Sequence, residues 1–463
     1  MFFSLSEPSG SSDPSADGPQ QNLASSAEAQ GGSPGPSAPP TNGGSGAPAP
    51  TLGPTETPSL VSDAELEPEE LAEARRYGRL QRKCLLADRA IDLVYWAVAA
   101  LLLAQPVERF LASVELLAQS DRFRLIALFT VLFLFHAAVS LPLAFYAGHV
   151  VEHRFGLSRL SALRWAGRYG KQLILALLLT LLVVVGLFWI IRGTGLWWWA
   201  VGAGAFFLLS VVMGQLAPVL ILPLFYRVEK LDRPELLDRL RRLAEGTGLS
   251  LEGIYRLDLS VETVKANAAL AGLGRTRRVL LGDTLLEHFP PEEIEAIFAH
   301  EVGHHVHRHM AKMLLIGLAV SAASFFICDR LLAWWVGLGT AGPQMGWPGQ
   351  VAPEPAGLAY QEFPVWAMPM VFFLLVVLGT LTGPALNALS RWHERQADWY
   401  ALKRTGNPAS FCRAFRRLTR LNKEDPDPPR WEVVLFHSHP PIRERLALAE
   451  QFPQERHEAP SSA

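Results

Sequence analysis

The segment PPEEIEAIFAHEVGHHVHRHM, residues 290–310, carries five histidines between apolar flanks. Prolines followed by acidic residues, with cations further along, are typical of a helix start, so we expect a helix as far as Met310. On such a helix His300 and His304 lie one turn apart and can reach one metal ion. Glu301 lies beside them, where its carboxylate can reach a water on that metal without becoming a ligand. The segment therefore predicts a catalytic metal-binding helix; the alternative is a structural histidine cluster at a helix end.

Two histidines need a third protein ligand if a fourth position is to stay open for water. The segment LSRWHERQADWYA, residues 389–401, supplies the candidates. Glu394 and Asp398 are four apart on an expected helix, so one face can offer a zinc-binding carboxylate and a second carboxylate that orients a ligand histidine. His393 is the rival ligand, but it points about 100° away from Glu394. Because nitrogen and oxygen ligands of this kind favour zinc, we predict one Zn2+ per chain with Glu394 as the third ligand.

The composition indicates an integral membrane protein. Of the 463 residues, 49% are hydrophobic and 19% are charged, and the mean hydropathy is +0.17. The formal net charge of -2 gives no indication of a nucleic-acid partner. Apolar stretches long enough to cross about 30 Å of hydrocarbon occur at 88–106, 124–149, 171–192, 196–223, 311–336 and 364–388. Asp329 and Arg330, near the outer end of the fifth stretch, are expected to snorkel to the interface.

The distribution of positive charge predicts the topology. Arg and Lys gather before the first apolar stretch and between the second and third, whereas residues 337–362 contain neither. By the positive-inside rule, both termini and the Arg-rich segments 227–310 and 389–463 then lie on the cytoplasmic side. These two segments could meet there and form one site.

We therefore expect an α-helical polytopic membrane protein with about six transmembrane helices and a cytoplasmic-side α+β domain. IYRLDLS, residues 254–260, should form a strand. KANAALAGL and RRVLLGDTL should form a β-hairpin joined through Gly274 and Arg275. The expected parts are a disordered low-complexity tail (1–62), a membrane domain with spans one to four (63–226), a first catalytic part (227–310), spans five and six (311–388) and a second catalytic part (389–463).

A series of spaced motifs between residues 146 and 450 resembles the integral-membrane zinc metalloproteases of the CAAX prenyl protease (type I) family, particularly bacterial relatives. The motifs, in order, are YAGHVVEHRFGLS, LILPLFYRVEKLD, VKANAALAGLGRTRRVLLGDTLL, HEVGH, SRWHERQADWYALK and HSHPPIRERL. The resemblance implies a zincin-like HExxH fold for the catalytic domain. Eukaryotic members of the family look like seven-span proteins, so this chain is expected to have one span fewer.

The resemblance also implies roles for individual residues. His300, His304 and Glu394 would be zinc ligands, Glu301 the catalytic base, and Asp398 the partner of a zinc histidine, His300 in particular. His439 would hydrogen-bond the oxyanion and Arg445 would support it; without the resemblance, the Ser-His-Pro-Pro segment is a polar turn before a helix. Asn267 and Ala268 would lie on an edge strand that binds substrate as an added strand, the alternative being a structural hairpin. His305, His307 and His309 lie beyond the motif. His307 is seven residues after His300 and shares its face; we interpret it as a solvated or chamber-lining histidine, the alternative being contact with an inhibitory metal ion.

These observations predict a membrane-embedded zinc-dependent endopeptidase. Its expected partners are the lipid bilayer and peptide or protein substrates, either lipidated CaaX-type substrates or membrane proteins and small peptides in quality control. A Leu-, Ala- and Arg-rich chain with a shortened membrane domain resembles a bacterial relative, which favours the second kind of substrate and a bacterial inner (plasma) membrane. A monomer is the expected oligomeric state. The alternatives are a non-catalytic chaperone or channel-clearing factor that keeps the fold, and a transporter, which usually needs polar or Gly/Pro-broken spans.

Overall fold

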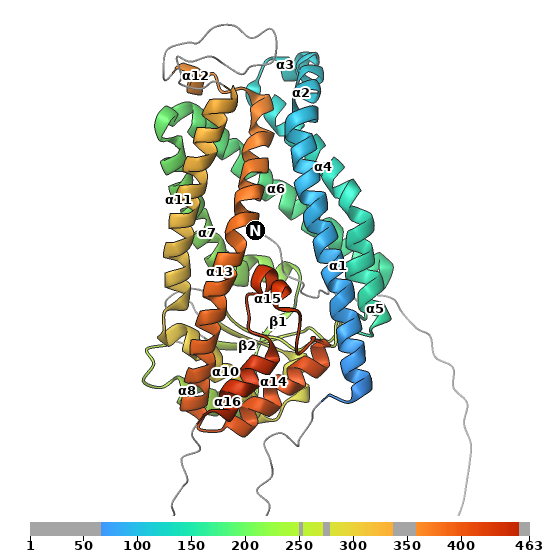
Figure 1. Ribbon diagram of the computed structural model, residues 1–463, viewed down its shortest axis with the longest axis vertical. Coiled ribbons are helices and arrows are strands. Elements are labelled where there is room, and N and C mark those ends of the chain that lie inside the picture. Colours follow the sequence, from blue (N-terminus) through green and yellow to red (C-terminus); the bar gives the residue numbers. More distant parts are fainter. Residues whose placement is uncertain (1–65, 250–252, 272–277, 337–357, 453–463) are drawn as a thin grey trace, which may run out of the picture.

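The structure is a computed structural model of the chain, and it describes residues 66–249, 253–271, 278–336 and 358–452. The tail expected to be disordered, residues 1–62, and the hairpin turn at Gly274 and Arg275 lie outside the described residues. Long helices form the upper part of the molecule in Figure 1, and a small sheet with shorter helices lies at their lower ends.

The upper part consists of long apolar helices and the short elements that continue or join them. In chain order these are α1 (Pro68–Val98), η1 (Ala99–Leu103), α2 (Ala104–Ala112), α3 (Glu115–Ala118), α4 (Asp121–Phe145), η2 (Tyr146–Val151), α5 (Glu152–Arg154), α6 (Ala162–Thr194), η3 (Gly195–Trp197), α7 (Trp198–Leu216), η4 (Ala217–Ile221), η5 (Leu222–Leu224), α11 (His309–Val336), α12 (Leu358–Gln361), η7 (Val365–Ala367) and α13 (Met368–Thr405). Five continuous helical stretches among the described residues are long and apolar enough to cross a membrane.

One of these five stretches contains two crossings. Ala162–Leu224 has 63 residues, and at 1.5 Å per residue it would extend about 95 Å, three times the thickness of the hydrocarbon core. Gly195, with φ 54° and ψ −126°, lies where α6 ends, and a positive φ is readily adopted by glycine. Helices α6 and α7 pack against each other. When α6 and α7 are counted separately, the described part of the chain has six crossings, the number that the sequence predicts.

Helix α13 connects the membrane part to the lower part without a break. It has 38 residues, so it combines the sixth apolar stretch, 364–388, with the segment that holds Glu394. Helix α1 also begins well before its apolar stretch, at Pro68, and packs against α13. A candidate metal ligand therefore stands on a helix whose other half is a membrane span.

Asp329 is buried, contrary to the expectation that it snorkels. Its side chain has no solvent exposure and accepts hydrogen bonds from Trp198 Nε1 at 2.6 Å, Tyr360 Oη at 2.7 Å and Arg330 Nε at 2.9 Å. The sequence pattern gave only the depth of Asp329, whereas the direction of its side chain depends on which helices pack around α11. The carboxylate thus links α11 to α7 and α12.

Replacing Asp329 with Ala is expected to destabilise the end of the helix bundle that lies away from the sheet. The change leaves the buried Trp198 and Tyr360 donors without their acceptor, at about 1–3 kcal/mol for each group that stays unsatisfied. We expect a lower midpoint of thermal unfolding for the detergent-purified protein than for the wild type. The exposed Glu362, two residues after Tyr360, supplies the control. Glu362→Ala should leave the midpoint of thermal unfolding unchanged. Equal midpoints for both variants would show that this buried network adds nothing to stability.

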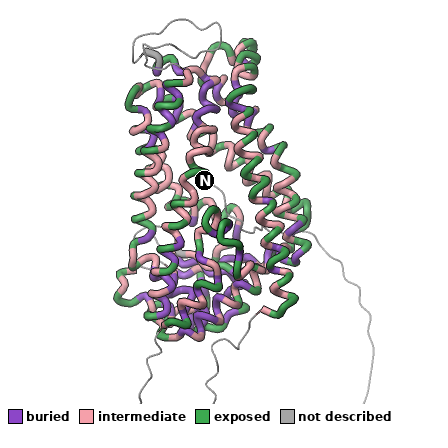
Figure 2. Tube along the Cα trace, viewed as in Figure 1, coloured by how far each residue is buried: buried purple, intermediate pink, exposed green. Residues whose placement is uncertain are grey.

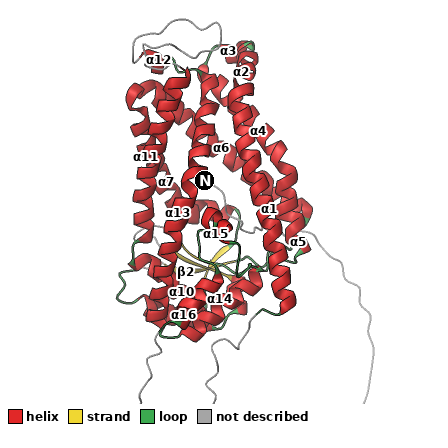
Figure 3. Ribbon diagram, viewed as in Figure 1, coloured by secondary structure: helices red, strands yellow, loops and turns green. Residues whose placement is uncertain are grey.

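The lower part contains a four-stranded sheet in the order β1-β2-β4-β3. Its strands are β1 (Val228–Lys230), β2 (Gly253–Leu257), β3 (Ala268–Ala271) and β4 (Arg278–Gly282). The antiparallel pairing of β3 with β4 confirms the predicted hairpin, and β2 confirms the predicted strand. β2 and β4 are parallel, while β1, which was not predicted, pairs antiparallel with β2. β3 lies at an edge of this sheet, and Figure 3 shows the strands lying below the long helices.

Shorter helices cover this sheet and surround one helix that carries the histidine motif. They are α8 (Pro234–Ala244), α9 (Asp283–His288), α10 (Pro291–Val306), α14 (Pro408–Asn422), α15 (Arg430–Phe436) and α16 (Ile442–Glu450). Phe298 and Val302 of α10 join Val279 and Leu281 of β4 in one buried cluster. Buried residues are dense in this part, whereas the long helices expose much of their surface (Figure 2). The apolar face of α10 is thus held on the sheet, and α13 packs along the same helix.

Helix α15 lies between α1 and α13 in Figure 1 and precedes the segment that contains His439. Arg82 of α1 forms an ion pair with Glu432 of α15, and His437 Nε2 lies 3.3 Å from the same carboxylate. Trp431 and Val434 of α15 are exposed. The helix is therefore tied to α1 by charge and exposes apolar side chains.

Candidate metal centre

A glycine allows the two helices of the site to lie close together. A Cβ atom at Gly303 would be 3.0 Å from Ala397 Cα and 3.1 Å from Tyr400 Cβ, closer than packed carbon atoms approach. Glycine is therefore required at this position of α10 by its contact with α13. The close approach brings His300 and His304 opposite Glu394 on α13.

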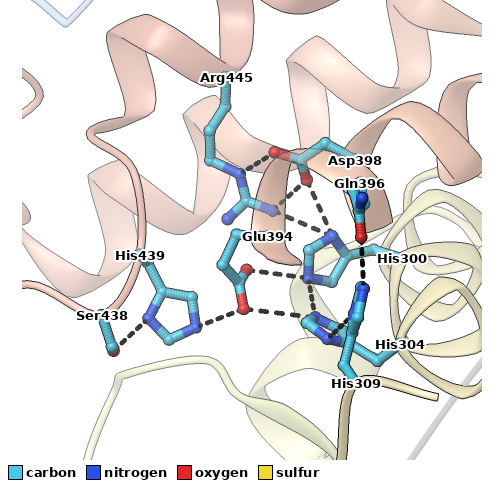
Figure 4. A network of polar contacts seen from close by, with 9 residues as sticks. All are labelled: His300, His304, His309, Glu394, Gln396, Asp398, Ser438, His439 and Arg445. Carbon is cyan, nitrogen blue, oxygen red and sulfur yellow. Dashed lines mark hydrogen bonds and ion pairs between the residues drawn. The ribbon is translucent and has the colours of Figure 1, made fainter. Parts of the chain in front are cut away.

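His300, His304 and Glu394 bring three potential ligand atoms together, all within 4.8 Å of one another. His300 Nε2 lies 3.1 Å from His304 Nε2 and 3.2 Å from Glu394 Oε2, and His304 Nε2 lies 3.3 Å from Glu394 Oε1. Figure 4 shows both imidazoles directed toward the carboxylate. His393 is buried but does not belong to this group, so the described structure favours Glu394 over its rival.

The chemistry of these atoms fits a bound cation. Two imidazole nitrogens at 3.1 Å repel each other unless a proton or a metal ion lies between them. Glu394 Oε2 is buried, and the polar atom that faces it among the described residues is His300 Nε2, 3.2 Å away. Burial disfavours the charged form of His300, but hydrogen bonds to Asp398 and Glu394 outweigh this effect and raise its pKa to about 10. A metal ion would replace that proton, so binding should release protons near neutral pH.

Asp398 and Arg445 fix the orientation of His300. His300 Nδ1 donates to Asp398 Oδ1 at 2.8 Å, and Arg445 Nε donates to Asp398 Oδ2 at 2.9 Å. Burial opposes the charge on Arg445, but Asp398 raises the guanidinium's pKa above its usual value, and the group also lies over the Phe415 ring. With its Nδ1 proton held by Asp398, His300 directs the Nε2 lone pair toward Glu394 and His304.

His309 and Gln396 orient the ring of His304, as Asp398 orients the ring of His300. The sequence analysis did not identify either residue in this role. Gln396 Oε1 lies 2.9 Å from His309 Nε2, and His309 Nδ1 lies 3.0 Å from His304 Nδ1. Because an amide oxygen only accepts, His309 must donate through Nε2, which leaves its Nδ1 to accept from His304 Nδ1–H. The His304 Nε2 lone pair then faces Glu394. His309 is also stacked on His393 at 4.2 Å between ring centroids.

The expected helix through Met310 is wrong at its end, and this explains why His309 was missed. α10 ends at Val306, Arg308 has φ 54°, and α11 begins at His309. On a continuous helix, His309 would be five residues beyond His304 and on another face. A left-handed residue other than glycine is uncommon, and no feature of the sequence indicates one at Arg308. The break turns the chain so that His309 is 3% exposed and contacts His304.

Replacing His309 with Ala is expected to weaken zinc binding while the ligands remain in place. Changes to the hydrogen-bond partners of metal ligands typically cost about 10–100-fold in affinity. We expect a shift of this size in a zinc titration against a competing chelator. His305→Ala, which changes a half-buried neighbouring histidine outside the ligand group, is the control and should bind zinc like the wild type. Unchanged affinity in the His309 variant would contradict a positioning role.

His439 lies beside the three candidate ligands, on the turn before α16. Its Nε2 is 3.4 Å from Glu394 Oε1, and its Nδ1 is 2.9 Å from Ser438 Oγ. The side chain is 63% exposed, yet the surrounding protein removes enough water to lower its pKa. Figure 4 shows the ring pointing toward Glu394 from the side away from Arg445. His439 is therefore accessible and still next to the ligand cluster.

Arg391 holds the segment that leads to His439. Its Nη1 donates to Val433 O at 2.7 Å and to His437 O at 2.6 Å, and Asn387 Nδ2 donates to Leu435 O at 2.9 Å. All three carbonyls belong to α15 or the residue after it. Because Arg391 and Asn387 are on α13, the helix that carries Glu394 also positions the loop with His439.

The remaining candidates are Glu301 and the edge strand. Glu301 is half-buried and makes no hydrogen bond or ion pair with the described residues, so its carboxylate is free to bind water. Ala268 begins β3, and Asn267, just before it, is exposed while its carbonyl accepts from Gly282 N at 2.9 Å. β3 packs against α10. The edge strand thus runs beside the helix that holds His300 and Glu301.

Comparison with known proteins assigns both parts of the chain. Residues 53–227 match the family model described as CAAX prenyl protease N-terminal, five membrane helices, and residues 230–452 match that of peptidase family M48. Within the first match, the described residues hold four long apolar helices, α1, α4, α6 and α7, one fewer than the description and in line with the predicted departure.

Similar individual proteins include a bacterial and a fungal relative. The uncharacterized metalloprotease YhfN of Bacillus subtilis is 27% identical over 83% of this chain and 87% of its own length. CAAX prenyl protease 1 of Saccharomyces cerevisiae is 26% identical over 88% of this chain and 91% of its own. The crystal structure of S. mikatae Ste24p superposes with a TM-score of 0.67 at 25% identity, covering 86% of this chain and 92% of that one.

Proposed function

The chain is a membrane-embedded metalloprotease of the M48, CAAX prenyl protease-like family, and from this premise we propose that it is a zinc endopeptidase with one metal ion per chain. His300, His304 and Glu394 are the proposed ligands. The observation that carries the proposal is the convergence of their three ligand atoms within 4.8 Å, beside the unpartnered Glu301. A zinc ion bound there supplies a Lewis acid that polarises a carbonyl and makes water more acidic.

The side chains around the proposed ligands suit peptide hydrolysis. Glu301 takes a proton from the attacking water and later delivers it to the departing amine. His439, accessible and close to Glu394, donates a hydrogen bond to the oxyanion that develops on the substrate carbonyl. Arg445 acts through Asp398 on the orientation of His300. Asn267 and Ala268 bind the substrate backbone at the edge of the sheet that β3 forms.

The proposed substrates are membrane-associated proteins or small peptides cleaved near the cytoplasmic face. Relatives are named CAAX prenyl proteases, which makes lipidated C-terminal peptides a class to test here. Trp431 and Val434 of α15, the helix that precedes the His439 segment, are exposed apolar side chains that could contact such substrates. The bacterial relative and the Arg-rich segments 227–310 and 389–463 support a bacterial inner-membrane location with both termini and the two catalytic parts in the cytoplasm.

Metal analysis and peptide cleavage by the detergent-purified protein test this function together. We expect close to one zinc per chain and cleavage of a quenched peptide library that stops on chelation and returns with zinc. Paired farnesylated and unmodified peptides of one sequence then show whether a lipid is required. Zinc without cleavage of any peptide would favour a non-catalytic chaperone, and protein without zinc would show that the three ligands are assigned wrongly.

A further inference from the structure

A cavity lies where α6 enters the membrane part, away from the metal centre. Its volume is about 190 Å³. The lining residues that matter here are Arg164, Gly167, Arg168, Lys171, Phe225 and Glu262. They come from the first turns of α6, from the chain after η5 and from the loop that follows β2. No residue of this cavity belongs to the metal site or contacts it in the described structure.

Two cations on α6 line this cavity without a side-chain hydrogen bond or ion pair to a described residue. Arg164 and Lys171 are seven residues apart, so they lie on the same face of the helix two turns from each other. Both are exposed, and neither side chain forms an ion pair with a described residue. Gly167 lies between them, and a Cβ atom there would meet nothing within 4 Å. The absence of a side chain at Gly167 therefore keeps the space between the two cations open.

The third cation in the cavity lining, Arg168, already interacts with other protein groups. Its Nη1 donates to Glu262 Oε2 at 3.3 Å, its Nη2 donates to Tyr226 Oη at 3.2 Å, and its guanidinium lies over the Phe225 ring. It balances the charge of Glu262 and forms a wall of the cavity. The cavity as a whole consequently keeps an excess of positive charge from Arg164 and Lys171.

Glu262 supplies a buried acceptor in the cavity lining. The residue is 1% exposed, and its Oε1 is buried with no hydrogen-bond donor among the described residues. Its loop is fixed in place, because Arg159 N donates to Glu262 O at 2.6 Å and Thr263 Oγ1 donates to Leu157 O at 2.7 Å. Burial raises the pKa of Glu262 to about 7. A buried acceptor of this kind is stabilised by a hydrogen-bond donor from a ligand.

The cavity lies at the depth of lipid headgroups. The apolar part of α6 follows Lys171 directly, and Arg164 is seven residues earlier, about 10 Å along the helix axis. The headgroup layer on each side of the hydrocarbon is of similar thickness, roughly 5–8 Å. The exposed apolar side chains of Leu224 and Val261 also line the cavity. A ligand here would therefore have a polar end among the cations and an apolar end toward the bilayer.

We propose that this cavity binds the headgroup of an anionic glycerophospholipid whose phosphate carries a hydroxylated arm, as in phosphatidylglycerol. Arg164 and Lys171 hold the phosphate, and a hydroxyl of the arm donates to Glu262 Oε1. Basic pockets between membrane helices are suited to such headgroups. The lipid would join α6 to the Glu262 loop and so fasten the membrane part to the catalytic part.

Binding of short-chain lipids to the detergent-purified full chain tests the chemistry of this site. Dioctanoyl phosphatidylglycerol is expected to bind more tightly than dioctanoyl phosphatidic acid, which lacks the hydroxyl arm, and than the zwitterionic phosphatidylethanolamine. Glycerol 3-phosphate without acyl chains should bind more weakly than any of them. Equal binding of the three lipids would overturn the proposal, and equal binding of glycerol 3-phosphate and phosphatidylglycerol would show a soluble phosphate site instead.

Variants at the cavity test its location. Arg164→Gln with Lys171→Gln should weaken phosphatidylglycerol binding about 25–30-fold, since each cation near an anionic surface is worth about fivefold. Gly167→Leu should abolish binding by filling the space, whereas Gly170→Leu, which also meets nothing within 4 Å but lies outside the cavity lining, should bind like the wild type. Both glycine variants keep every charge. Undiminished binding in the double variant or in Gly167→Leu would refute the assignment.

Discussion

Glu301→Gln is expected to retain zinc and to lose peptide cleavage. The substitution keeps the size of the side chain, and Glu301 has no described partner whose loss would disturb α10. A positioned general base contributes about 10²–10⁴-fold to the rate, and glutamine cannot take up the proton. We expect kcat/KM to fall by this amount while the zinc content stays near one per chain.

Glu292→Gln is the matched control for that experiment. It removes a carboxylate from the first turn of the same helix, where the side chain is exposed and pairs with Arg239. An exposed ion pair of this type contributes little, so activity and zinc content should both equal those of the wild type. If Glu301→Gln cleaved peptides at the wild-type rate, another group would have to serve as the base.

Glu394→Gln is expected to lose the metal itself. The change removes the only charged ligand of the proposed set and leaves two neutral imidazoles, His300 and His304, to hold a divalent cation. We expect a loss of zinc affinity greater than the roughly 10–100-fold that is typical when a hydrogen-bond partner of a metal ligand is changed. Cleavage should disappear under metal-buffered conditions and return in part with excess zinc.

Metal analysis after equilibration with a zinc buffer measures this effect. Arg395→Gln, on the next residue of α13, is the control because its ion pair with Glu444 is exposed on both sides. It should keep zinc and activity. Full zinc content in the Glu394 variant would leave His393 or another group as the third ligand and would remove Glu394 from the proposal.

The sequence was sufficient for the features that depend on local spacing. His300 and His304 one turn apart, and Glu394 and Asp398 one turn apart, each follow from the geometry of a single helix. The β3–β4 hairpin follows in the same way from alternating residues around a glycine-containing turn. Pairing the two helices needed the resemblance to known proteases, since no local pattern relates segments that are ninety residues apart.

Features that depend on packing between segments were not predictable. The sequence shows Gly303 only as a glycine within a helix; its requirement appears when Ala397 lies 3.0 Å from where a Cβ would be. His309 reaches His304 because the backbone turns at Arg308, a residue without a turn signature. Asp329 is buried because Trp198 and Tyr360, which are distant from it in the sequence, pack around its carboxylate and donate hydrogen bonds to it. In each case the deciding contact is with a residue far along the sequence or depends on one unusual backbone angle.

A metal ion held by the proposed ligands on α10 and α13 would form a cross-link within the chain. Between His304 and Glu394 the polypeptide passes up through α11 and back down through α13, so an ion held by both residues closes a ring that crosses the bilayer twice. Closing a ring of about ninety residues restricts the unfolded chain much as a disulfide over the same span would, nominally by about 4–5 kcal/mol. Removing the ion opens that ring. The fold of two membrane helices is thus thermodynamically linked to the occupancy of a site outside the hydrocarbon.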